Sequence, residues 1–424
     1  MNEELLQFIW QAGLFDAHQL LSTQGQEIEI IKRGNLNVDS GPDFSEASIR
    51  IDGALWFGQV EIHIHSDDWY KHKHHKDQTY NNTILHVVYI NNEKCFRSDG
   101  TEVPCLELKD RITNNLQKTY EHLKFNRSEI PCAQHLQNVP RLMYRQAIDR
   151  SLVDRLKQKS DWVYEWLKHS TGDWHSVFMA SLIRSFGFGI NSEAFEQLAL
   201  NLPVTLLCRN AHDPSFIEAM LFGTAGFLNE QAVDEHQKTL QNEWQFLQKK
   251  YNLNALDKSV FKYLRMRPGN FPEIRIAQLC ALISDFQVLL NRVIGLRDTA
   301  EIIELLRPNI SLYWIQHYGF GKRGKRINGN LSLASAQIVV INAVVPFLFV
   351  YGKQTGNEHF SSNALDILQC LPPEINHITN EWKSIGIEAV SAYDSQGLLG
   401  LKKELCDKRL CLNCPVGRHL MKST

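Results

Sequence analysis

The sequence predicts an α+β chain in which a mixed α/β domain, residues 1–125, precedes a large all-α domain, residues 126–424. Two patterns predict this class. Apolar and polar residues alternate with the period of strands before about residue 110, whereas apolar residues recur at helical spacing after it. The composition, 43% hydrophobic and 22% charged residues, is typical of folded globular domains and excludes extensive disorder.

The first domain opens with helical spacing over Glu4–Leu21, interrupted at Gly13. The Asp52-Gly53 pair is a strong signal for a two-residue hairpin turn between strands. Alternation and β-branched residues predict three strands, at Glu27–Arg33, Ala47–Asp52 and Leu55–His65.

Two further segments complete this domain. The polar stretch Asp68–Asn81 is expected to be helical or a loop, and the apolar run Thr83–Ile90 is typical of a buried strand. The expected order is therefore a helix, a three-stranded meander, a polar segment and another strand.

The second domain is expected to be helical, with Pro- and Gly-bearing connectors such as Arg267–Asn270. Helical spacing appears at Leu142–Leu167, Trp174–Phe186, Ala232–Tyr251, Ile274–Val293, Ala334–Val350 and Ile385–Leu405.

No segment predicts a membrane span, because no run approaches roughly 18 uninterrupted apolar residues. The longest, Ile338–Val350, is broken by Asn342 and Pro346. The N-terminus carries acidic residues where a signal peptide carries basic ones, and an odd number of cysteines, 9, fits a reducing compartment. We therefore expect a cytoplasmic protein without a membrane partner.

The predicted strand Leu55–His65 carries the most informative polar pattern. Its period of two puts Val60, Ile62 and Ile64 on one face and Glu61, His63 and His65 on the other. Asp43 precedes the neighbouring strand, so a hairpin at Asp52-Gly53 returns Glu61 and His63 toward it. Carboxylates from adjacent strands are suited to Mg²⁺ or Mn²⁺. The expected metal ligands are Asp43, Glu61, His63 and His65.

This arrangement resembles the PD-(D/E)XK nuclease superfamily. Pro42-Asp43 matches the Pro-Asp of its motif, and Glu61-Ile62-His63 matches its acid-X-Lys with histidine in place of lysine. The expected element order is also similar to the α-β-β-β-α-β core of that superfamily. The resemblance implies metal-dependent phosphodiester hydrolysis, with Asp43 and Glu61 holding Mg²⁺ or Mn²⁺ and His63 in the water-orienting position. Because lysine is absent, a catalytically inactive fold that acts as a nucleic-acid-binding or scaffold protein is the alternative.

The segment after the strand adds further candidates. On a helix, Asp77 and Tyr80 would share a face and could position a phosphate or a water molecule. The histidines of the His72–His75 run fit a solvated polar surface, and His86 inside an apolar strand fits a hydrogen-bonded core histidine.

A second metal-site hypothesis uses the string His63-Ile64-His65-Ser66-Asp67. This HxHxD pattern resembles the metallo-β-lactamase-type hydrolase signature. That signature continues with histidine, whereas this chain has Asp68, which makes the hypothesis the weaker one.

Three C-terminal cysteines, Cys406, Cys411 and Cys414, have the C-x₄-C-x₂-C spacing that can converge on an ion or a cluster. Cys370 or His419 would supply a fourth ligand. Some nucleases of the superfamily named above carry an iron–sulfur cluster held by cysteines flanking the nuclease core, so the resemblance implies such a cluster. The spacing permits zinc equally, and reduced cysteines without a metal are the remaining possibility.

A basic loop provides the candidate nucleic-acid contact. Gly residues separate its four cations, which makes a flexible positive segment suited to phosphates, although a solvated connector has the same pattern. The first 110 residues hold 18 acidic and 9 basic residues, so a nucleic-acid partner would need a basic surface elsewhere. The four cations are Lys322, Arg323, Lys325 and Arg326.

Over its whole length the chain resembles an uncharacterised bacterial domain-of-unknown-function family. The stretches that carry this resemblance are GPDF, VEIHIHSDDW, TILHVV, RPGNFPEIRIAQL, NAVVPFLFVYG and CLNCPVG. The resemblance implies no activity, so function has to be argued from the site residues.

Overall fold

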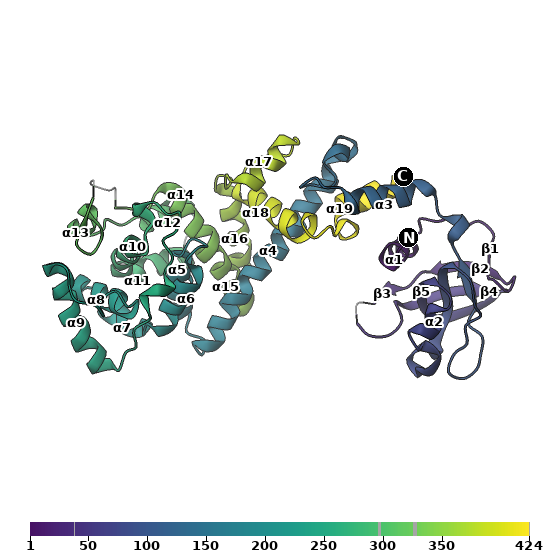
Figure 1. Ribbon diagram of the computed structural model, residues 1–424, viewed down its shortest axis with the longest axis horizontal. Coiled ribbons are helices and arrows are strands. Elements are labelled where there is room, and N and C mark those ends of the chain that lie inside the picture. The colour runs from purple at the N-terminus through teal and green to yellow at the C-terminus, as the bar shows by residue number, and fades with distance from the viewer. Residues whose placement is uncertain (38, 296–297, 325–328, 424) are drawn as a thin grey trace. The chain divides into compact units, whose positions relative to one another are not determined.

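The computed structural model describes residues 1–37, 39–295, 298–324 and 329–423 (Figure 1). It is a mixed α/β chain with a sheet in its N-terminal part and helices through most of the remainder, which confirms the coarse fold class. Two compact units divide the chain. The first unit is Met1–Ile148 with Leu401–Thr424, and the second unit is Asp149–Gly400.

These units differ from the expected domains, 1–125 and 126–424, at both ends. The boundary falls within helix α4 (Arg141–His169), and the C-terminal segment returns to the first unit. Long-range contacts explain the return: Lys402 Nζ bonds Glu129 Oε2 at 2.8 Å, and the Arg418 guanidinium bonds Gln11 Oε1 at 3.0 Å. Pairings so distant in sequence leave no local pattern to predict them.

The sheet of the first unit has the strand order β1-β2-β4-β5-β6-β7, with β3 paired to β4. Strands β2, β4 and β5 form an antiparallel meander, whereas β5 pairs with β6, and β6 with β7, in parallel. The strands are β1 (Leu20–Leu21), β2 (Glu27–Lys32), β3 (Asn35–Leu36), β4 (Phe44–Ile51), β5 (Ala54–His65), β6 (Thr83–Ile90) and β7 (Cys105–Glu107).

The hairpin between β4 and β5 is the one that the Asp52-Gly53 pair predicts. Both residues adopt positive φ, 47° and 81°, which the two central positions of a type I′ turn require. The turn sets the register as far as the pairing of Ala47 with Gly58, and a shift between Phe44 and Ala47 then pairs Phe44 with Val60 at the far end of the hairpin. This register brings the residue before β4, Asp43, beside Glu61.

Each face of β5 is covered by a different element of the first unit. Helix α1 (Glu3–Ala12) packs Leu6 and Trp10 into a core that contains Val60 and Ile62, and it ends at Gly13, whose φ is 68°. The other face meets the crossover to β6, and α1 and α2 flank the sheet on opposite sides in Figure 1.

The crossover is three short turns, where the sequence allowed a helix or a loop. They are α2 (Asp68–Lys71), η1 (His74–Lys76) and η2 (Gln78–Asn82). Trp69 and Tyr80 anchor them in a small apolar cluster with Cys95 and Val103. The crossover is therefore held against the sheet by packing as well as by its turns.

The rest of the first unit consists of short helices. They are η3 (Lys109–Arg111), α3 (Asn114–Phe125), η4 (Ala133–Asn138), η8 (Leu401–Cys406), η9 (Cys411–Asn413) and α19 (Pro415–Lys422).

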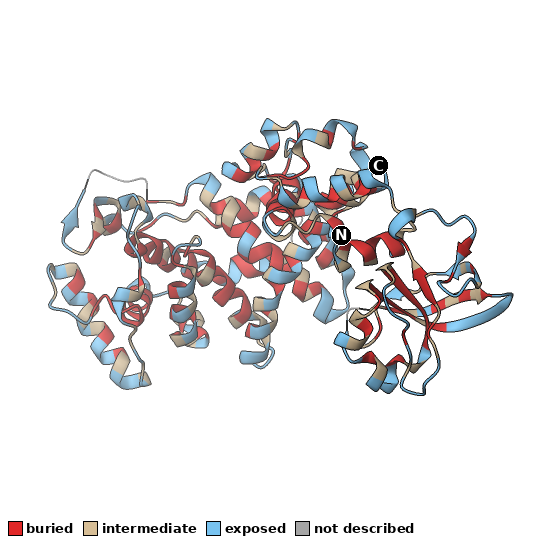
Figure 2. Cartoon of the chain, turned by 45° about the vertical axis from the view of Figure 1, so that its right-hand side comes forward, coloured by how far each residue is buried: buried red, intermediate tan, exposed pale blue. Residues whose placement is uncertain are grey.

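The second unit is helical, with one two-stranded ribbon, β8 (His317–Gly319) and β9 (Lys322–Arg323). Its helices turn apolar faces into a continuous core that includes Phe178, Phe222 and Trp244, as the buried faces in Figure 2 show. The helices are α5 (Trp174–Ser185), α6 (Ser192–Asn201), α7 (Val204–Arg209), α8 (Pro214–Thr224), α9 (Glu235–Tyr251), η5 (Lys258–Val260), η6 (Pro268–Asn270), α10 (Pro272–Ser284), α11 (Phe286–Gly295), α12 (Thr299–Leu305), α13 (Leu312–Gln316), α14 (Leu333–Val339), η7 (Val340–Val344), α15 (Val345–Thr355), α16 (Glu358–Cys370), α17 (His377–Ser384) and α18 (Ala392–Gly400).

One helix is long and apolar enough to cross a membrane by length and composition. It is the continuous run α14–η7–α15, Leu333–Thr355, which Asn342 and Pro346 do not break. Within the most apolar 18-residue stretch of this helix, 61% is buried inside the protein. The core of the second unit includes its residues Val340, Phe347 and Leu348, which is the environment of a core helix.

Candidate metal centre

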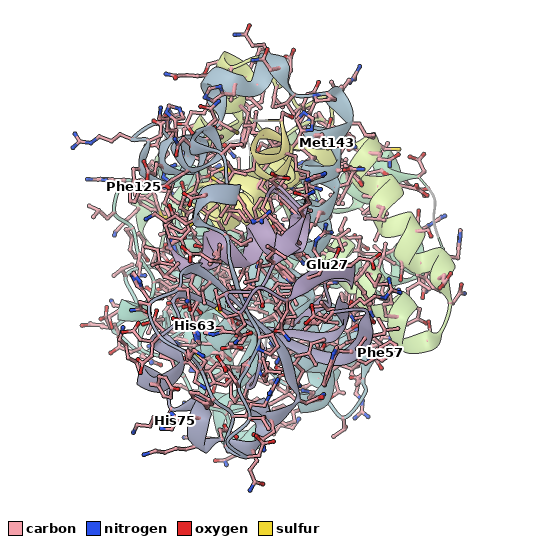
Figure 3. All side chains as sticks on the ribbon, turned by 90° about the vertical axis from the view of Figure 1, so that its right-hand side faces the viewer. Glu27, Phe57, His63, His75, Phe125 and Met143 are labelled. Carbon is pink, nitrogen blue, oxygen red and sulfur yellow. The ribbon has the colours of Figure 1, made fainter. Side chains whose placement is uncertain are left out.

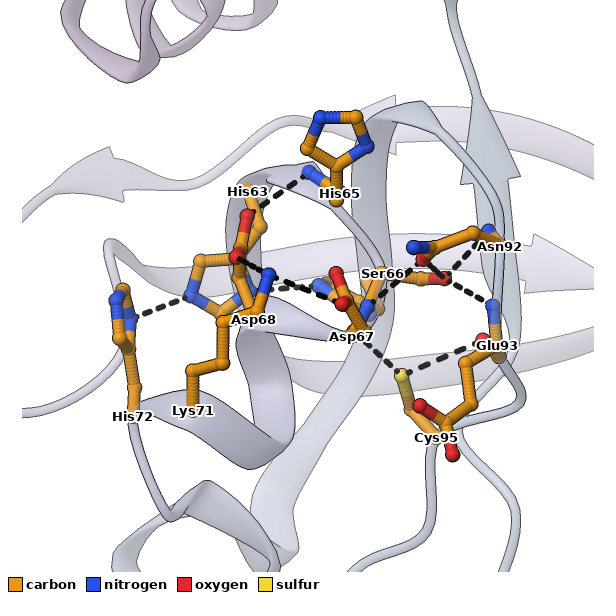
Figure 4. Close-up of polar contacts among 11 residues, drawn as sticks. His63, His65, Ser66, Asp67, Asp68, Lys71, His72, Asn92, Glu93 and Cys95 are labelled. Atoms are coloured by element: carbon orange, nitrogen blue, oxygen red, sulfur yellow. Dashed lines mark hydrogen bonds and ion pairs between the residues drawn. The ribbon is translucent and has the colours of Figure 1, made fainter.

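A polar cluster lies where β5 meets the crossover of the first unit. Strand β5 supplies Glu61 and His63, and the turns after it supply His72 and His74. Among the residues that the structure describes, His63, His72 and His74 form the one group of three or more potential ligand atoms lying within 4.8 Å of one another. Figure 3 labels His63 in this unit, and Figure 4 shows His72 reaching it from the crossover.

Three separations between the donor atoms are close to the edge of a tetrahedral site. His63 Nε2 lies 3.1 Å from His72 Nδ1. Glu61 Oε1 lies 3.5 Å from His63 Nε2 and 3.2 Å from His74 Nε2. Zinc bonds of about 2.0–2.1 Å place tetrahedral ligands about 3.3 Å apart, which matches these three edges.

His74 Nε2 is a donor atom of this cluster that lacks a hydrogen bond. It is buried and has no hydrogen bond among the described residues, although Glu61 Oε1 is near it. Its ring is fixed by stacking on Tyr80, with centroids 3.8 Å apart. A buried polar atom without a hydrogen bond is costly, so a positioned and unsatisfied nitrogen points to a missing ligand.

Burial lowers the pKa of three of the histidines, His63, His74 and His86. The pKa of His63 falls to about 2, first because the ring is buried and then because His86, His74 and His72 would repel its positive charge. Burial lowers the pKa of His86 to about 3 and also lowers the pKa of His74. Neutral imidazole is the form that binds a metal, so His63 and His74 are already in the binding form at neutral pH.

The two predicted carboxylates meet as the hairpin requires. The Asp43 amide donates to Glu61 Oε2 at 3.0 Å, and the Ile62 amide donates to Asp43 Oδ2 at 3.0 Å. Gln7 on α1 donates to Asp43 Oδ1 at 2.9 Å. Burial raises the pKa of both carboxyl groups, and the charge of Glu61 raises the pKa of Asp43 further. A cation between the neighbouring groups would oppose these shifts.

The structure brings Asp43, Glu61 and His63 together but leaves three other predicted residues out. The ring of His65 points away from the cluster in Figure 4. Asp77 is exposed and caps η2, accepting from the Thr79 amide at 2.9 Å. Tyr80 is buried behind His74 as a packing partner.

His72 and His74 are the members that the sequence interpretation missed, because it assigned their run to a solvated surface. His74 is 8% exposed, whereas His72 is exposed and forms the solvent side of the cluster. The signal in the sequence was the density of histidines directly after a strand bearing Glu61 and His63. Spacing alone does not reveal that the crossover folds back onto that strand.

The HxHxD hypothesis does not assemble a second site. Asp67 and Asp68 both pair with Lys71, at 2.9 and 2.8 Å, and Asp68 also accepts from the His65 amide. These carboxylates therefore stabilise the start of α2, and neither is in the group of three histidines.

The basic loop lies in the second unit. Lys322 and Arg323 form β9 and are exposed, with the Arg323 Nε atom 3.4 Å from His317 Nε2. Lys325 and Arg326 lie outside the described residues.

The predicted cysteine ligands belong to two different units. Cys406, Cys411 and Cys414 belong to the first unit, whereas Cys370 is exposed at the end of α16 in the second unit. His419 is on α19, where the Ser423 hydroxyl donates to its carbonyl oxygen at 2.9 Å.

Together, the fold and the cluster define an α+β protein with a buried histidine–carboxylate centre beside a mixed sheet. The chain belongs to the family described as "Protein of unknown function (DUF2851)", whose model matches residues 3–377. This match confirms the resemblance over nearly the whole chain and supplies no activity. Searches of curated proteins and of solved structures found no match.

Proposed function

We propose that this protein is a metal-dependent phosphodiester hydrolase, a nuclease, whose ion is held by His63, His72 and His74, with Glu61 beside it. The observation that carries the proposal is the set of donor atoms separated by 3.1, 3.2 and 3.5 Å. Among these atoms, His74 Nε2 is buried without a hydrogen bond, so hydrogen bonding does not explain its position and a bound ion does. Zinc, iron or another transition ion fits this set better than Mg²⁺, because imidazole nitrogen is a poor ligand for Mg²⁺.

The phosphodiester substrate is supported by the placement of the acids on the fold. Asp43 stands at the start of the second meander strand and Glu61 in the middle of the third, which are the positions that the PD-(D/E)XK resemblance assigns to its acids. A helix precedes the meander, and β6 follows it in parallel, as in that core. The observed departure is the histidine-rich donor set.

A bound divalent ion would polarise a phosphoryl oxygen and lower the pKa of an attacking water. The residues of the chain have separate tasks around it. Asp43 ties the start of β4 to β5 through the Ile62 amide and so fixes the position of Glu61. His63 is held by His86, and the exposed His72 leaves the solvent side open to substrate.

The test uses the full chain with single- and double-stranded DNA and RNA carrying a fluorophore and a quencher. Chelated protein is supplied separately with Zn²⁺, Fe²⁺, Mn²⁺ and Mg²⁺ before cleavage is followed. We expect cleavage with a transition ion and its loss in His74→Ala. The adjacent His75, which is outside the cluster, provides the matched control His75→Ala.

The second candidate function is a catalytically inactive nuclease-like fold with a structural ion. If Glu61 also bound the ion, four protein ligands would close a tetrahedral coordination sphere, which is typical of structural zinc sites. Tight binding of an ion at His74 without cleavage of any of the four substrates would favour this candidate. Absence of ion binding in the wild-type chain would contradict both functions.

A further inference from the structure

A cavity of about 500 Å³ lies within the helical second unit, apart from the histidine cluster. This volume is typical of small-molecule sites, which measure roughly 300–1,000 Å³. Three arginines line it, Arg265, Arg267 and Arg275, and none of the described residues that line it is acidic. This arginine cavity therefore has the charge of an anion-binding site.

The stretch RPGNFPEIRIAQL, which carries part of the family resemblance, forms much of the basic lining. It contributes Arg267, Asn270 and Arg275 to the arginine cavity. Pro268 begins the short turn η6, and Pro272 begins helix α10. Proline at the first position of a helix fixes the backbone there, so η6 holds Arg267 and Asn270 just before the helix that carries Arg275.

The Arg275 guanidinium is held in place without being neutralised. It is 7% exposed and donates to Asn270 Oδ1 at 2.8 Å and to Gln278 Oε1 at 3.0 Å. The Gln278 amide is oriented in turn by donation to the Gly329 carbonyl at 2.9 Å. Both acceptors of Arg275 are neutral, and no carboxylate pairs with it in the part of the chain that the structure describes.

The charge of Arg275 therefore lacks an opposite charge. Burial lowers the pKa of Arg275 to about 10, so the guanidinium remains charged at neutral pH. A buried charge without a partner of opposite sign is costly. Bound anion would offset this cost, which neutral amide oxygens do only in part.

Phe188 covers one face of the same guanidinium. Its ring centroid lies 4.1 Å from Arg275 Cζ, so an anion has to approach the edge of the guanidinium, where the N–H groups are. Phe188 has a φ of 45°, which is unusual for a bulky residue. A Cβ atom on Gly187 would lie 2.5 Å from the Asn191 carbonyl oxygen, so the tight turn around Phe188 requires glycine there. Strained backbone held in this way is concentrated at ligand-binding and catalytic sites.

The other two arginines come from a loop that is tied to this turn. Asn191 Nδ2 donates to the Lys262 carbonyl at 2.9 Å, and the Lys262 amide donates to Asn191 Oδ1 at 2.7 Å. Arg265 and Arg267 follow in the same loop and are exposed, and Arg265 has a φ of 62°. Neither has an ion-pair partner among the described residues. The cavity thus combines one buried and two exposed guanidinium groups.

The rest of the lining suits an organic anion. Ser332 and Ser335 carry hydroxyl groups, which can donate to oxygen atoms of a ligand. Ile190 is 51% exposed and, with Phe188 and Met266, adds an apolar part to the wall. Small-molecule sites typically combine such an apolar wall with a few placed polar groups.

We propose that the arginine cavity binds a small organic phosphate, with Arg265, Arg267 and Arg275 on the phosphate group and the apolar wall on its carbon body. A phosphate monoester carries a charge of about −1.5 to −2 at neutral pH, so it matches three guanidinium groups better than a carboxylate does. Its oxygens also accept paired N–H groups from an arginine. The site goes beyond the proposed hydrolase and does not depend on it.

The test measures binding to the full chain by isothermal titration calorimetry, with phenyl phosphate, benzoate and inorganic phosphate as probes. We expect one phenyl phosphate per chain, bound about 10-fold or more tightly than benzoate, because hydrogen bonds to the more highly charged group are stronger. No binding of phenyl phosphate, or equal binding of benzoate, would overturn the proposal. Inorganic phosphate bound as tightly as phenyl phosphate would overturn an organic ligand.

Variants place the binding in this cavity. Arg265→Gln with Arg267→Gln changes two exposed side chains and should weaken phenyl phosphate binding about 10–100-fold. The matched control is Arg209→Gln with Arg292→Gln, at two exposed arginines of the same unit outside the cavity, and should bind as the wild type does. Unchanged affinity in the first variant would overturn the proposal.

Two further variants separate the roles of charge and place. Arg275→Lys keeps the positive charge and loses the paired N–H groups, so it should also bind phenyl phosphate more weakly. His74→Ala should bind phenyl phosphate as the wild type does, because His74 belongs to the first unit. Loss of binding in His74→Ala would assign the phosphate to the candidate metal centre and contradict the site in the arginine cavity.

Discussion

His63 Nδ1 lies 2.9 Å from His86 Nε2, and both rings are completely buried. One nitrogen has to donate the proton of this hydrogen bond. If His63 donates, its Nε2 carries a lone pair toward Glu61 and His72, which is the tautomer that a metal ligand needs. His86 pairs with Cys105 in the parallel β6–β7 ladder, so the sheet itself holds this second histidine.

This relationship predicts that His86 controls metal affinity without binding the ion. In His86→Phe, His63 loses the partner that fixes its tautomer, and affinity for Zn²⁺ should fall by about 10–100-fold. Competition with a chromophoric chelator measures the change. His86→Gln, whose amide oxygen can accept the same proton, should recover part of it. If folded His86→Phe bound Zn²⁺ as tightly as the wild type, His86 would contribute only to packing.

Gly223 in α8 is predicted to reject the alanine that helices normally favour. A Cβ atom there would lie 2.1 Å from the Trp244 ring, which is itself buried. Gly223→Ala should therefore lower the free energy of unfolding by about 1–3 kcal/mol through overpacking. Chemical denaturation measures this change. Gly295→Ala, with nothing within 4 Å of its Cβ, is the control and should be neutral or stabilising.

A buried carboxyl group, Glu273, predicts a pH dependence of stability in the second unit. Burial raises the pKa of Glu273, with Tyr263, Lys322 and Lys258 acting in the opposite direction. Above the ordinary value of 4.5 the unfolded chain releases this proton while the folded chain retains it. The stability of the wild type relative to Glu273→Gln should therefore fall as pH rises above 4.5, until the folded carboxyl ionises.

Thermal unfolding of both chains between pH 4 and pH 9 tests this sign. Glu235→Gln, which removes an exposed carboxylate at the start of α9, is the control for general charge effects. A stability difference that rises with pH, or one that matches the control, would contradict the assignment.

The basic loop predicts a salt-dependent interaction with nucleic acid. Neutralising all four cations by glutamine substitution at 322, 323, 325 and 326 should weaken binding of duplex DNA. The slope of the logarithm of the binding constant against the logarithm of the salt concentration should become shallower by about 0.9 for each phosphate that the loop no longer neutralises. Fluorescence anisotropy at several salt concentrations measures both quantities. The control is the double variant Lys157→Gln with Lys249→Gln, at two exposed helix positions. If the loop variant and the wild type had the same salt dependence of binding, the loop would be only a solvated connector.

The local part of the site could be predicted because strands and turns follow short-range rules. The Asp52-Gly53 pair sets the hairpin, and the period of β5 sets Glu61 and His63 on one face. Asp43 meets Glu61 only because the register also shifts between Phe44 and Ala47, which neither pattern predicts. The same alternation predicted His65 as a further ligand, but its ring points away from the cluster. His65 is the last residue of β5, shortly before α2 begins.

The sequence by itself determined the class of the first unit, its hairpin and the face of β5 that carries Glu61 and His63, because each depends on residues close along the chain. Only the tertiary structure decided the rest. His74 reaches Glu61, and His72 reaches His63, because Trp69 and Tyr80 anchor the crossover against β5. The C-terminal cysteines belong to the first unit because the last segment returns to it. Such long-range packing depends on how distant apolar and charged surfaces fit together, which local periodicity does not encode.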